Sequence, residues 1–199
     1  MIQKAFEIEN FLDENEVVFL ENIQKRLKKT FNLGNTKKAY TNGFDYSLIK
    51  KVIQPKLNKI FGSFGVTDCM ILEEFVPWTI HTDYIKKDSK PYYACLIPLS
   101  YENKITHTVV FNEVATKLDW GAQLPDSNYK FDSDTLSLLD HCSAEQLKKV
   151  SLYNSYKWQR GKLIAWDRTL LHTSDNFTKA GITTKNALVL FLNLDHEKN

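Results

Sequence analysis

Cysteine is scarce in this chain, and no secretory signal is visible. The 199 residues include 3 cysteines, at Cys69, Cys95 and Cys142, and no CxxC pair. A structural zinc site is therefore not expected, and the odd number indicates reduced thiols rather than a disulfide framework. Residues 1–7 lack the apolar stretch of a secretory signal. We therefore expect a cytoplasmic protein.

Long apolar runs and a large charge of either sign are also lacking. The longest nearly unbroken apolar run, residues 187–192, is too short to cross a bilayer. The formal net charge is only +2, which offers no basic stripe to a nucleic-acid backbone. Neither a membrane nor a nucleic-acid partner is expected. With 43% hydrophobic and 25% charged residues, the composition is that of a folded globular protein, taken as one domain over residues 1–199.

The N-terminal third, residues 1–65, reads as helical support. Asp13 and Glu16 have the spacing of a capping box, which predicts the start of a first amphipathic helix. Gly34 is a plausible stop for it. A second amphipathic helix is predicted over residues 46–61, with a kink or break at Pro55. Helices placed before a β-rich body would cover one face of a sheet.

From residue 66 to residue 194 the pattern becomes β-rich. There is no βαβ rhythm, so the sheet should be mostly antiparallel. Many short strands of this kind predict a sandwich, a jelly roll or a barrel, and the fold class is α+β. The predicted strands cover residues 68–75, 78–84, 92–99, 107–111, 162–166, 170–174 and 186–194.

A polar stretch, residues 112–157, interrupts the strands. It contains a short helix opened by Ser143 and Gln146, again at capping-box spacing. An insertion this long between core strands is usually functional or mobile. We predict a lid that recognises substrate, the alternatives being a decorative loop or a self-association interface. Its aromatic residues, and one just beyond it, could line a pocket or simply pack: Trp120, Tyr129 and Trp158.

Two segments carry residue types that bind metals. In His81-Thr82-Asp83, positions i and i+2 of a strand would point to the same face, so both side chains could hold one ion. The alternative is a polar pair where a strand leaves the sheet. Far along the chain, His172 and Ser174 share one face of another predicted strand. A lone histidine there is more often a hydrogen-bonded core residue than a ligand.

A cation stands at the start of the most apolar predicted strand. If Lys185 points into the interior, its ammonium could pair with a ligand carboxylate. The alternative is a lysine whose charged end reaches back to water at a strand end. The other histidines, His107, His141 and His196, have no partner at ligand spacing and are expected to be structural.

An H-x-D motif, a distal histidine and a basic residue shortly beyond, in this order, resemble the Fe(II)/2-oxoglutarate-dependent dioxygenase superfamily. Within it, the sequence most resembles the phytanoyl-CoA dioxygenase-like branch, where a serine often follows the distal histidine by two places, as Ser174 does. Residues 73–81 also resemble that branch's approach to its first ligand. The resemblance covers residues 66–194 and implies a double-stranded β-helix (jelly-roll) core with N-terminal helices packed on one sheet.

The resemblance also implies a set of ligands. His81, Asp83 and His172 would form a facial triad on Fe(II), leaving three open positions for 2-oxoglutarate and O₂. Lys185 and Ser174 would bind the far carboxylate of 2-oxoglutarate. An arginine is the commoner anchor in the superfamily, but no arginine follows position 168 in this chain.

The implied activity is hydroxylation of an unidentified substrate, a small molecule or a protein side chain, with release of succinate and CO₂. Related halogenases replace the iron carboxylate by a small residue, so Asp83 favours hydroxylation. The alternatives are a non-catalytic or a cupin-like jelly-roll metal-binding or regulatory protein. Cupins bring several clustered histidines, whereas only His81 and His172 fit here. The motifs indicate no single substrate and no oligomeric state.

Overall fold

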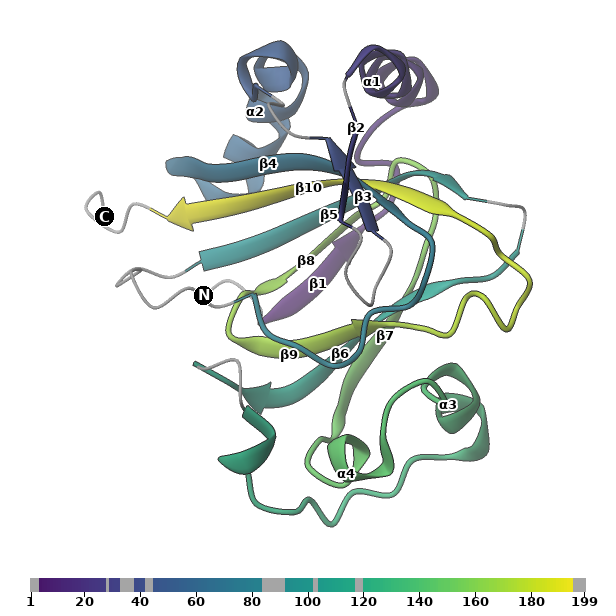
Figure 1. The fold of residues 1–199 in the computed structure, drawn as a ribbon. Helices are drawn as coiled ribbons and strands as arrows, with labels where there is room; N and C mark the ends of the chain where they lie inside the picture. Colours follow the sequence, from purple (N-terminus) through teal and green to yellow (C-terminus); the bar gives the residue numbers. More distant parts are fainter. Residues whose placement is uncertain are drawn as a thin grey trace.

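The computed structural model describes residues 4–27, 29–32, 38–41, 45–83, 92–101, 104–116 and 120–194. Within them, two antiparallel β-sheets face each other, and two long helices lie on the outer side of the larger sheet (Figure 1). The larger sheet has, in spatial order, β1 (Ala5–Ile8), β8 (Leu163–Asp167), β5 (Tyr92–Tyr101), β10 (Lys185–Leu194), β4 (Phe64–Glu74), β3 (Lys38–Thr41) and β2 (Lys29–Asn32). The smaller sheet has β7 (Leu152–Lys157), β6 (His107–Val114) and β9 (Leu170–Ser174).

The chain passes back and forth between the two sheets. From β5 to β10 it enters the smaller sheet at β6 and β7, returns at β8, crosses again at β9 and returns at β10. The turn from β8 to β9 is tight, because the Asp167 carboxylate accepts hydrogen bonds from both the amide and the hydroxyl of Thr169. This alternation is the double-stranded β-helix, so the predicted fold class is confirmed.

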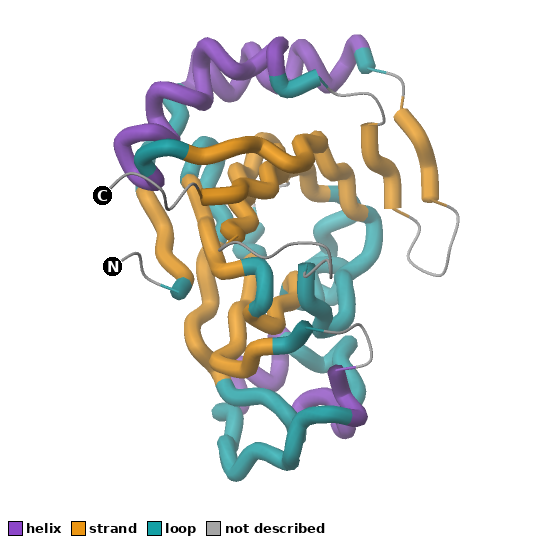
Figure 2. Tube along the Cα trace, turned by 90° about the vertical axis from the view of Figure 1, so that its left-hand side faces the viewer, coloured by secondary structure: helices purple, strands orange, loops and turns teal. Residues whose placement is uncertain are grey.

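The helices α1 (Glu14–Arg26) and α2 (Ser47–Phe61) cover the outer face of the larger sheet, as predicted (Figure 2). The capping box at Asp13 and Glu16 is present and fixes the start of α1. The predicted stop at Gly34 is wrong, because α1 ends at Arg26 and β2 follows from Lys29. The helix α2 continues through Pro55 without a break.

One hydrophobic core joins these helices to the sheet. Fully burying one Leu or Ile side chain contributes about 1.5–3 kcal/mol, so this layer fixes the helices on the sheet. Its helical side chains include Leu20, Ile49, Ile53 and Leu57, and its sheet side chains include Ile71, Ile97, Leu188 and Leu190. The inner faces of the same strands line the space between the two sheets.

Three expectations about segment boundaries need correction. Residues 78–83 are not a strand, because the only pairing there in the described part is a single bridge from His81 to His172; Tyr84 lies outside the described residues. The predicted helical support also contains strands β1, β2 and β3. The predicted insertion, residues 112–157, begins within β6 and ends with β7, so the non-strand part is shorter than expected.

The segment between β6 and β7 packs on the outer face of the smaller sheet. It contains the short helices η1 (Trp120–Ala122), α3 (Ser133–Leu138) and α4 (Ala144–Leu147), drawn at the bottom of Figure 1. The capping box of Ser143 and Gln146 opens α4, as predicted. Buried side chains of this segment join those of the sheet in a separate core, with Trp120, Leu139 and Val150 against Val109, Phe111 and Leu171.

The three cysteines, Cys69, Cys95 and Cys142, are all buried and form no disulfide. Burial raises the pKa of the Cys142 thiol to about 11. A thiol with a raised pKa is protonated near neutral pH and reacts slowly. Across the described part of the chain, none of the helices is long and apolar enough to cross a membrane.

Candidate metal centre

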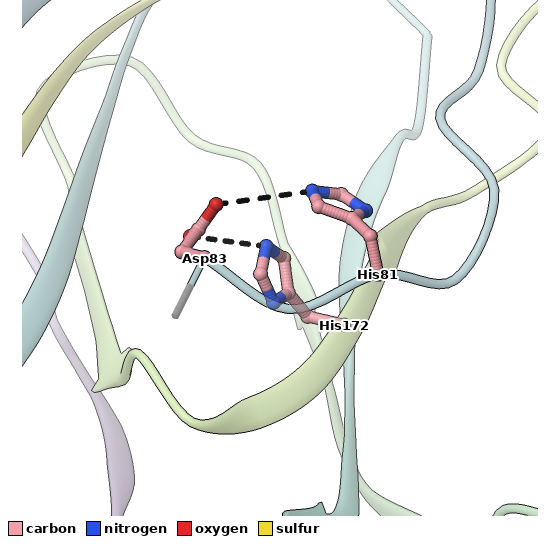
Figure 3. Close-up of side chains that lie close together, drawn as sticks. All are labelled: His81, Asp83 and His172. Atoms are coloured by element: carbon pink, nitrogen blue, oxygen red, sulfur yellow. Dashed lines mark ion pairs between the residues drawn. The ribbon is translucent and has the colours of Figure 1, made fainter. Parts of the chain in front are cut away.

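Three side chains predicted as ligands converge at one end of the space between the sheets. His81, Asp83 and His172 each offer one ligand atom, and these atoms lie within 4.8 Å of one another (Figure 3). The His172 Nε2 atom is 3.2 Å from Asp83 Oδ2, and His81 Nε2 is 4.0 Å from Asp83 Oδ1. Two imidazoles and a carboxylate in this arrangement match the facial set that non-haem Fe(II) prefers.

The protein orients both imidazoles in the same way. The Nδ1 atom of His81 is 2.8 Å from the carbonyl oxygen of Thr79, and that of His172 is 3.1 Å from the carbonyl oxygen of Leu170. A carbonyl only accepts hydrogen bonds, so each Nδ1 carries a hydrogen, and in the neutral ring the lone pair is then on Nε2. Metal-binding histidines are commonly oriented by such a bond. In both rings Nε2 is the atom that faces Asp83.

His81 and His172 meet through the backbone, not through a shared strand. The amide of His81 donates to the carbonyl of His172 at 3.0 Å, and the reverse bond measures 2.9 Å. This one-residue bridge joins the loop at residues 75–83 to β9 and brings the two rings to 4.3 Å. The prediction that His81 and Asp83 share a strand face is wrong, yet the two side chains still approach the same point.

The loop is tied to the β8–β9 turn on the other side of Asp83. The Thr82 hydroxyl lies 3.1 Å from the carbonyl of Ala115 and 3.0 Å from that of Arg168. The Arg168 guanidinium donates to the Asp83 carbonyl at 2.8 Å and stacks 4.1 Å above the Phe191 ring. These contacts fix the backbone on which the carboxylate stands.

The segment between β6 and β7 forms hydrogen bonds to the backbone of the same loop. The Trp120 indole donates to the Ile80 carbonyl at 3.3 Å, and His141 Nε2 lies 2.9 Å from the Trp78 carbonyl. None of the described residues 120–151 lines the cavity. Their apolar side chains pack on the smaller sheet, and the lid stays a prediction.

The Asp83 carboxyl is held in its ionised form. Burial by itself would raise its pKa, but the nearby His172, and more weakly His81 and Arg168, lower that pKa to about 2. The alternative interpretation, a structural ion pair of Asp83 with His172, uses the same contact. A structural ion pair needs only His172. The additional approach of His81 to the same carboxylate favours a metal site.

A cavity of about 670 Å³ extends from these side chains between the sheets. Near the candidate ligands its wall includes Trp78 and Trp166, whose indole rings pack on His81 at 4.9 Å and on His172 at 4.8 Å. One long wall is apolar and is formed by Met70, Leu72, Leu96, Val189 and Phe191. The polar end is formed by Glu74, Thr108, Trp158, Ser174 and Lys185.

Lys185 lies at this polar end and is fully buried. The alternative of a lysine that reaches back to water is thereby excluded. Its ammonium lies 3.5 Å from Thr106 Oγ1, 3.7 Å from Glu74 Oε2 and 3.9 Å from Asp175 Oδ1. The Trp158 ring lies 4.1 Å from the ammonium. Burial lowers the pKa of Lys185, and the two carboxylates oppose that shift.

The other cations considered as anchors point elsewhere. Lys162 pairs with Glu7 at 3.1 Å and with Glu9 at 2.6 Å, near strand β1. Arg168 contacts the Asp83 backbone and the Phe191 ring. Of the lysines and arginines in the described ranges, Lys185 is the one that lines the cavity.

The structure gives Ser174 and the aromatic residues specific places. The Ser174 hydroxyl oxygen accepts a hydrogen bond from the Trp78 amide at 2.8 Å, and the side chain lines the cavity. Trp158 lines the cavity as well, whereas Trp120 packs in the outer core and Tyr129 is 41% exposed. A serine hydroxyl that accepts one bond still has its own hydrogen to donate.

The remaining histidines behave as structural residues where they are described. His107 contacts Asp175 at 3.2 Å, and His141 contacts the Trp78 carbonyl in the loop at residues 75–83, here called the metal loop. Burial lowers the pKa of His141, which favours the neutral ring. His196 lies outside the described residues.

Sequence reasoning missed Glu74 and Asp175, which flank Lys185. Glu74 could have been found, because it follows Met70 and Leu72 at intervals of two and so faces the cavity with them. Asp175 directly follows Ser174, but its contact with Lys185 depends on the crossing from β9 to β10. No local pattern indicates that contact.

No protein-family model matches this chain, and no curated protein matches its sequence. Solved structures do match. One is the non-heme alpha ketoglutarate dependent epimerase SnoN from nogalamycin biosynthesis, at 12% identity and a TM-score of 0.62, covering 96% of this chain and 76% of that one. A second is HygX from Streptomyces hygroscopicus with nickel and 2-oxoglutarate bound, at 11% identity and a TM-score of 0.54, covering 97% and 84%.

A third similar structure is a Pseudomonas putida prolyl-4-hydroxylase, at 10% identity and a TM-score of 0.55, covering 96% of this chain and 93% of that one. At such identities the similarity shows the fold, which is the double-stranded β-helix of the Fe(II)/2-oxoglutarate oxygenases. The phytanoyl-CoA dioxygenase-like branch is not singled out by these matches, so that finer resemblance stays a prediction.

Proposed function

We propose that this protein is a 2-oxoglutarate- and O₂-dependent non-haem iron oxygenase that hydroxylates its substrate and releases succinate and CO₂. One observation carries the proposal. The Nε2 atoms of two imidazoles and one carboxylate converge on a single point in a cavity that is also lined by a buried ammonium. A metal and a dicarboxylate would together satisfy both ends.

The donor set fits Fe(II). His81, Asp83 and His172 would supply three ligands on one side of the ion and leave the cavity side open. When bound, Fe(II) and 2-oxoglutarate supply the activation of O₂. The protein's own part is to fix the three donors, through the Thr79 and Leu170 carbonyls and the bridge between the histidines.

We assign the anchor of the distal carboxylate of 2-oxoglutarate to Lys185, with Ser174 as a second donor. The ammonium is fully buried, lines the cavity and makes only long contacts of 3.5 Å with Thr106 and 3.7 Å with Glu74, so a carboxylate on the cavity side would form a shorter bond with it. A charge-assisted bond in such a dry site is stronger than one at the surface. Cosubstrate binding would also shield this end from water.

The substrate would occupy the part of the cavity that 2-oxoglutarate leaves free. Its apolar wall, which includes Met70, Val189 and Phe191, suits an aliphatic or aromatic group. The names of the similar structures include an epimerase of nogalamycin biosynthesis and a prolyl-4-hydroxylase. We therefore propose a small molecule or a protein side chain as the substrate class.

Anaerobic titration tests the proposal directly. We expect purified protein with Fe(II) and 2-oxoglutarate to develop a weak visible metal-to-ligand charge-transfer band. The same titration with succinate, which lacks the keto group, serves as the matched control and should give no such band. A cupin-like or non-catalytic metal-binding protein would bind Fe(II) without this band. Succinate release from 2-oxoglutarate during a substrate screen would then identify the reaction partner.

A further inference from the structure

Lys185 does not stand alone at the polar end of the cavity. It lies directly opposite Glu74 in the register of β10 and β4, and such pairs have neighbouring side chains on one face. Glu74 is only 5% exposed and its Oε2 atom is 3.7 Å from the ammonium. A buried carboxylate beside a cation that is to receive another carboxylate is an unusual arrangement, because like charges repel strongly in a dry site.

The second acid near Lys185 is already engaged by other groups. Asp175 accepts hydrogen bonds from the Thr106 hydroxyl at 2.7 Å and from the His107 amide at 2.7 Å, and it contacts the His107 ring at 3.2 Å. Its distance to Lys185 is 3.9 Å. Asp175 thus belongs to a network with β6, whereas Glu74 faces Lys185 across the strand pair and lines the cavity.

We propose that Glu74 is the resident counterion of Lys185, and that the distal carboxylate of the cosubstrate must displace it from the ammonium to bind. This inference rests on the proposed function. Glu74 keeps the buried ammonium charged while the cavity is empty, and it weakens the cosubstrate's hold by occupying the same cation. It is a positioning residue that sets both the affinity and the pH range of binding.

The charges around the ammonium make the expected signs definite. Glu74 on β4 and Asp175 after β9 stabilise the charged form of Lys185. Two histidines are also near: His107 on β6 contacts Asp175, and His141, in the turn before α4, is close enough to interact electrostatically with both Asp175 and Lys185. Removing the Glu74 charge removes a competitor, so binding becomes tighter where Lys185 is protonated. The same change further lowers the pKa of Lys185, so binding is lost at a lower pH.

The experiment measures 2-oxoglutarate affinity by calorimetry on Ni(II)-loaded protein, which needs no turnover. For Glu74→Gln we expect roughly tenfold tighter binding at neutral pH, as repulsion between two carboxylates in a partly dry site predicts. We also expect the alkaline loss of affinity to occur at a lower pH than in the wild type. Glu73→Gln removes the same charge from the adjacent position, whose side chain alternates to the other face, and should change neither quantity.

A second ligand isolates the distal carboxylate. 2-Oxopentanoate carries a methyl group in its place, so Glu74→Gln should leave its affinity unchanged while raising that of 2-oxoglutarate. A general distortion of the site would weaken both ligands together and would overturn the proposal, as would equal affinities for 2-oxoglutarate in wild type and variant. If Glu74→Gln does not fold, Glu74→Asp withdraws the carboxylate by one methylene and should show the same changes in smaller measure.

The proposed function fails in a different way. In that case wild-type Ni(II)-loaded protein would bind neither ligand. Binding of 2-oxoglutarate by the wild type, with no response to Glu74→Gln, would remove the counterion role alone.

Discussion

The two imidazoles of the candidate metal centre differ in exposure but are oriented in the same way. The His172 side chain is 6% exposed and that of His81 is 29% exposed, yet both direct Nδ1 to a backbone carbonyl. A core histidine needs only satisfied hydrogen bonds. Both rings instead keep Nε2 towards one carboxylate, which is the arrangement a metal requires.

At this scale, the first prediction concerns the three ligands. His81→Ala, Asp83→Ala and His172→Ala should each abolish tight Fe(II) binding and leave the protein folded, because each removes one of three donors and none of the three belongs to the helix-to-sheet core. Metal analysis of the purified variants, with circular dichroism for the fold, checks this. Asp126→Ala removes a carboxylate whose side chain is 67% exposed and should load iron like the wild type. Full iron content in any of the three variants would remove that residue from the site.

The second prediction concerns the buried ammonium. Lys185→Ala should raise the 2-oxoglutarate requirement about ten- to a hundredfold, the value of a charge-assisted contact, with little effect on the iron requirement. Lys185→Arg should restore part of the affinity. Lys162→Ala, which removes a lysine paired with Glu7 and Glu9, is the matched control. An unchanged cosubstrate affinity in Lys185→Ala would mean that another group binds the carboxylate.

At the scale of elements, the metal loop at residues 75–83 depends on contacts from outside itself. Thr82→Val keeps the shape of the side chain but removes its contacts with the carbonyls of Ala115 and Arg168. We expect about ten- to a hundredfold weaker metal binding, as for other residues that hold ligands in place. Thr79→Val changes an exposed side chain on the same loop and leaves its carbonyl on His81. Equal metal affinities in the two variants would contradict this role of Thr82.

At the same scale, the segment between β6 and β7 could act either as a support for the metal loop or as a substrate lid. Since Trp120 and His141 hold the loop from behind, hydrogen exchange in residues 120–151 should respond to metal binding and little to substrate. A substrate lid would behave in the opposite way, exchanging fast without substrate and slowly with it. Exchange measured with metal alone, and then with cosubstrate and substrate added, distinguishes these outcomes.

Most regular elements could be predicted from the sequence because their patterns are local. The capping boxes at Asp13 and Ser143 and the strand at residues 170–174 depend on neighbours along the chain. Residues 78–83 could not be assigned correctly, because the bridge that orders them comes from β9. The strand β7 was hidden inside a polar stretch, since half of its residues face solvent.

The site was predictable in its residue types and order, but not in its inner surroundings. His81, Asp83, His172 and Lys185 carry a recognisable order along the chain. The positions of Glu74, Asp175 and Arg168 follow from strand register and from a turn, which only the fold determines.

For the whole molecule, the helix-to-sheet core and the site occupy opposite faces of the same strands. Leu188 packs towards the helices, while Lys185 and Val189 face the cavity. Leu188→Ala should therefore lower the free energy of unfolding by about 2–5 kcal/mol, with metal affinity retained in the folded protein. Denaturant unfolding and metal titration below the transition measure the two effects. A large loss of metal affinity would show that the two faces are coupled.

The bridge between His81 and His172 also has a consequence for the order in which the protein can be completed during synthesis. Two of the three candidate donors emerge from the ribosome with residues 81–83, but the third follows only with β9, and the buried ammonium later still with β10. A nascent chain that ends before β9 lacks one of the three candidate iron ligands. We therefore expect tight Fe(II) binding only once β9 has paired with β6 and the bridge to His81 has formed.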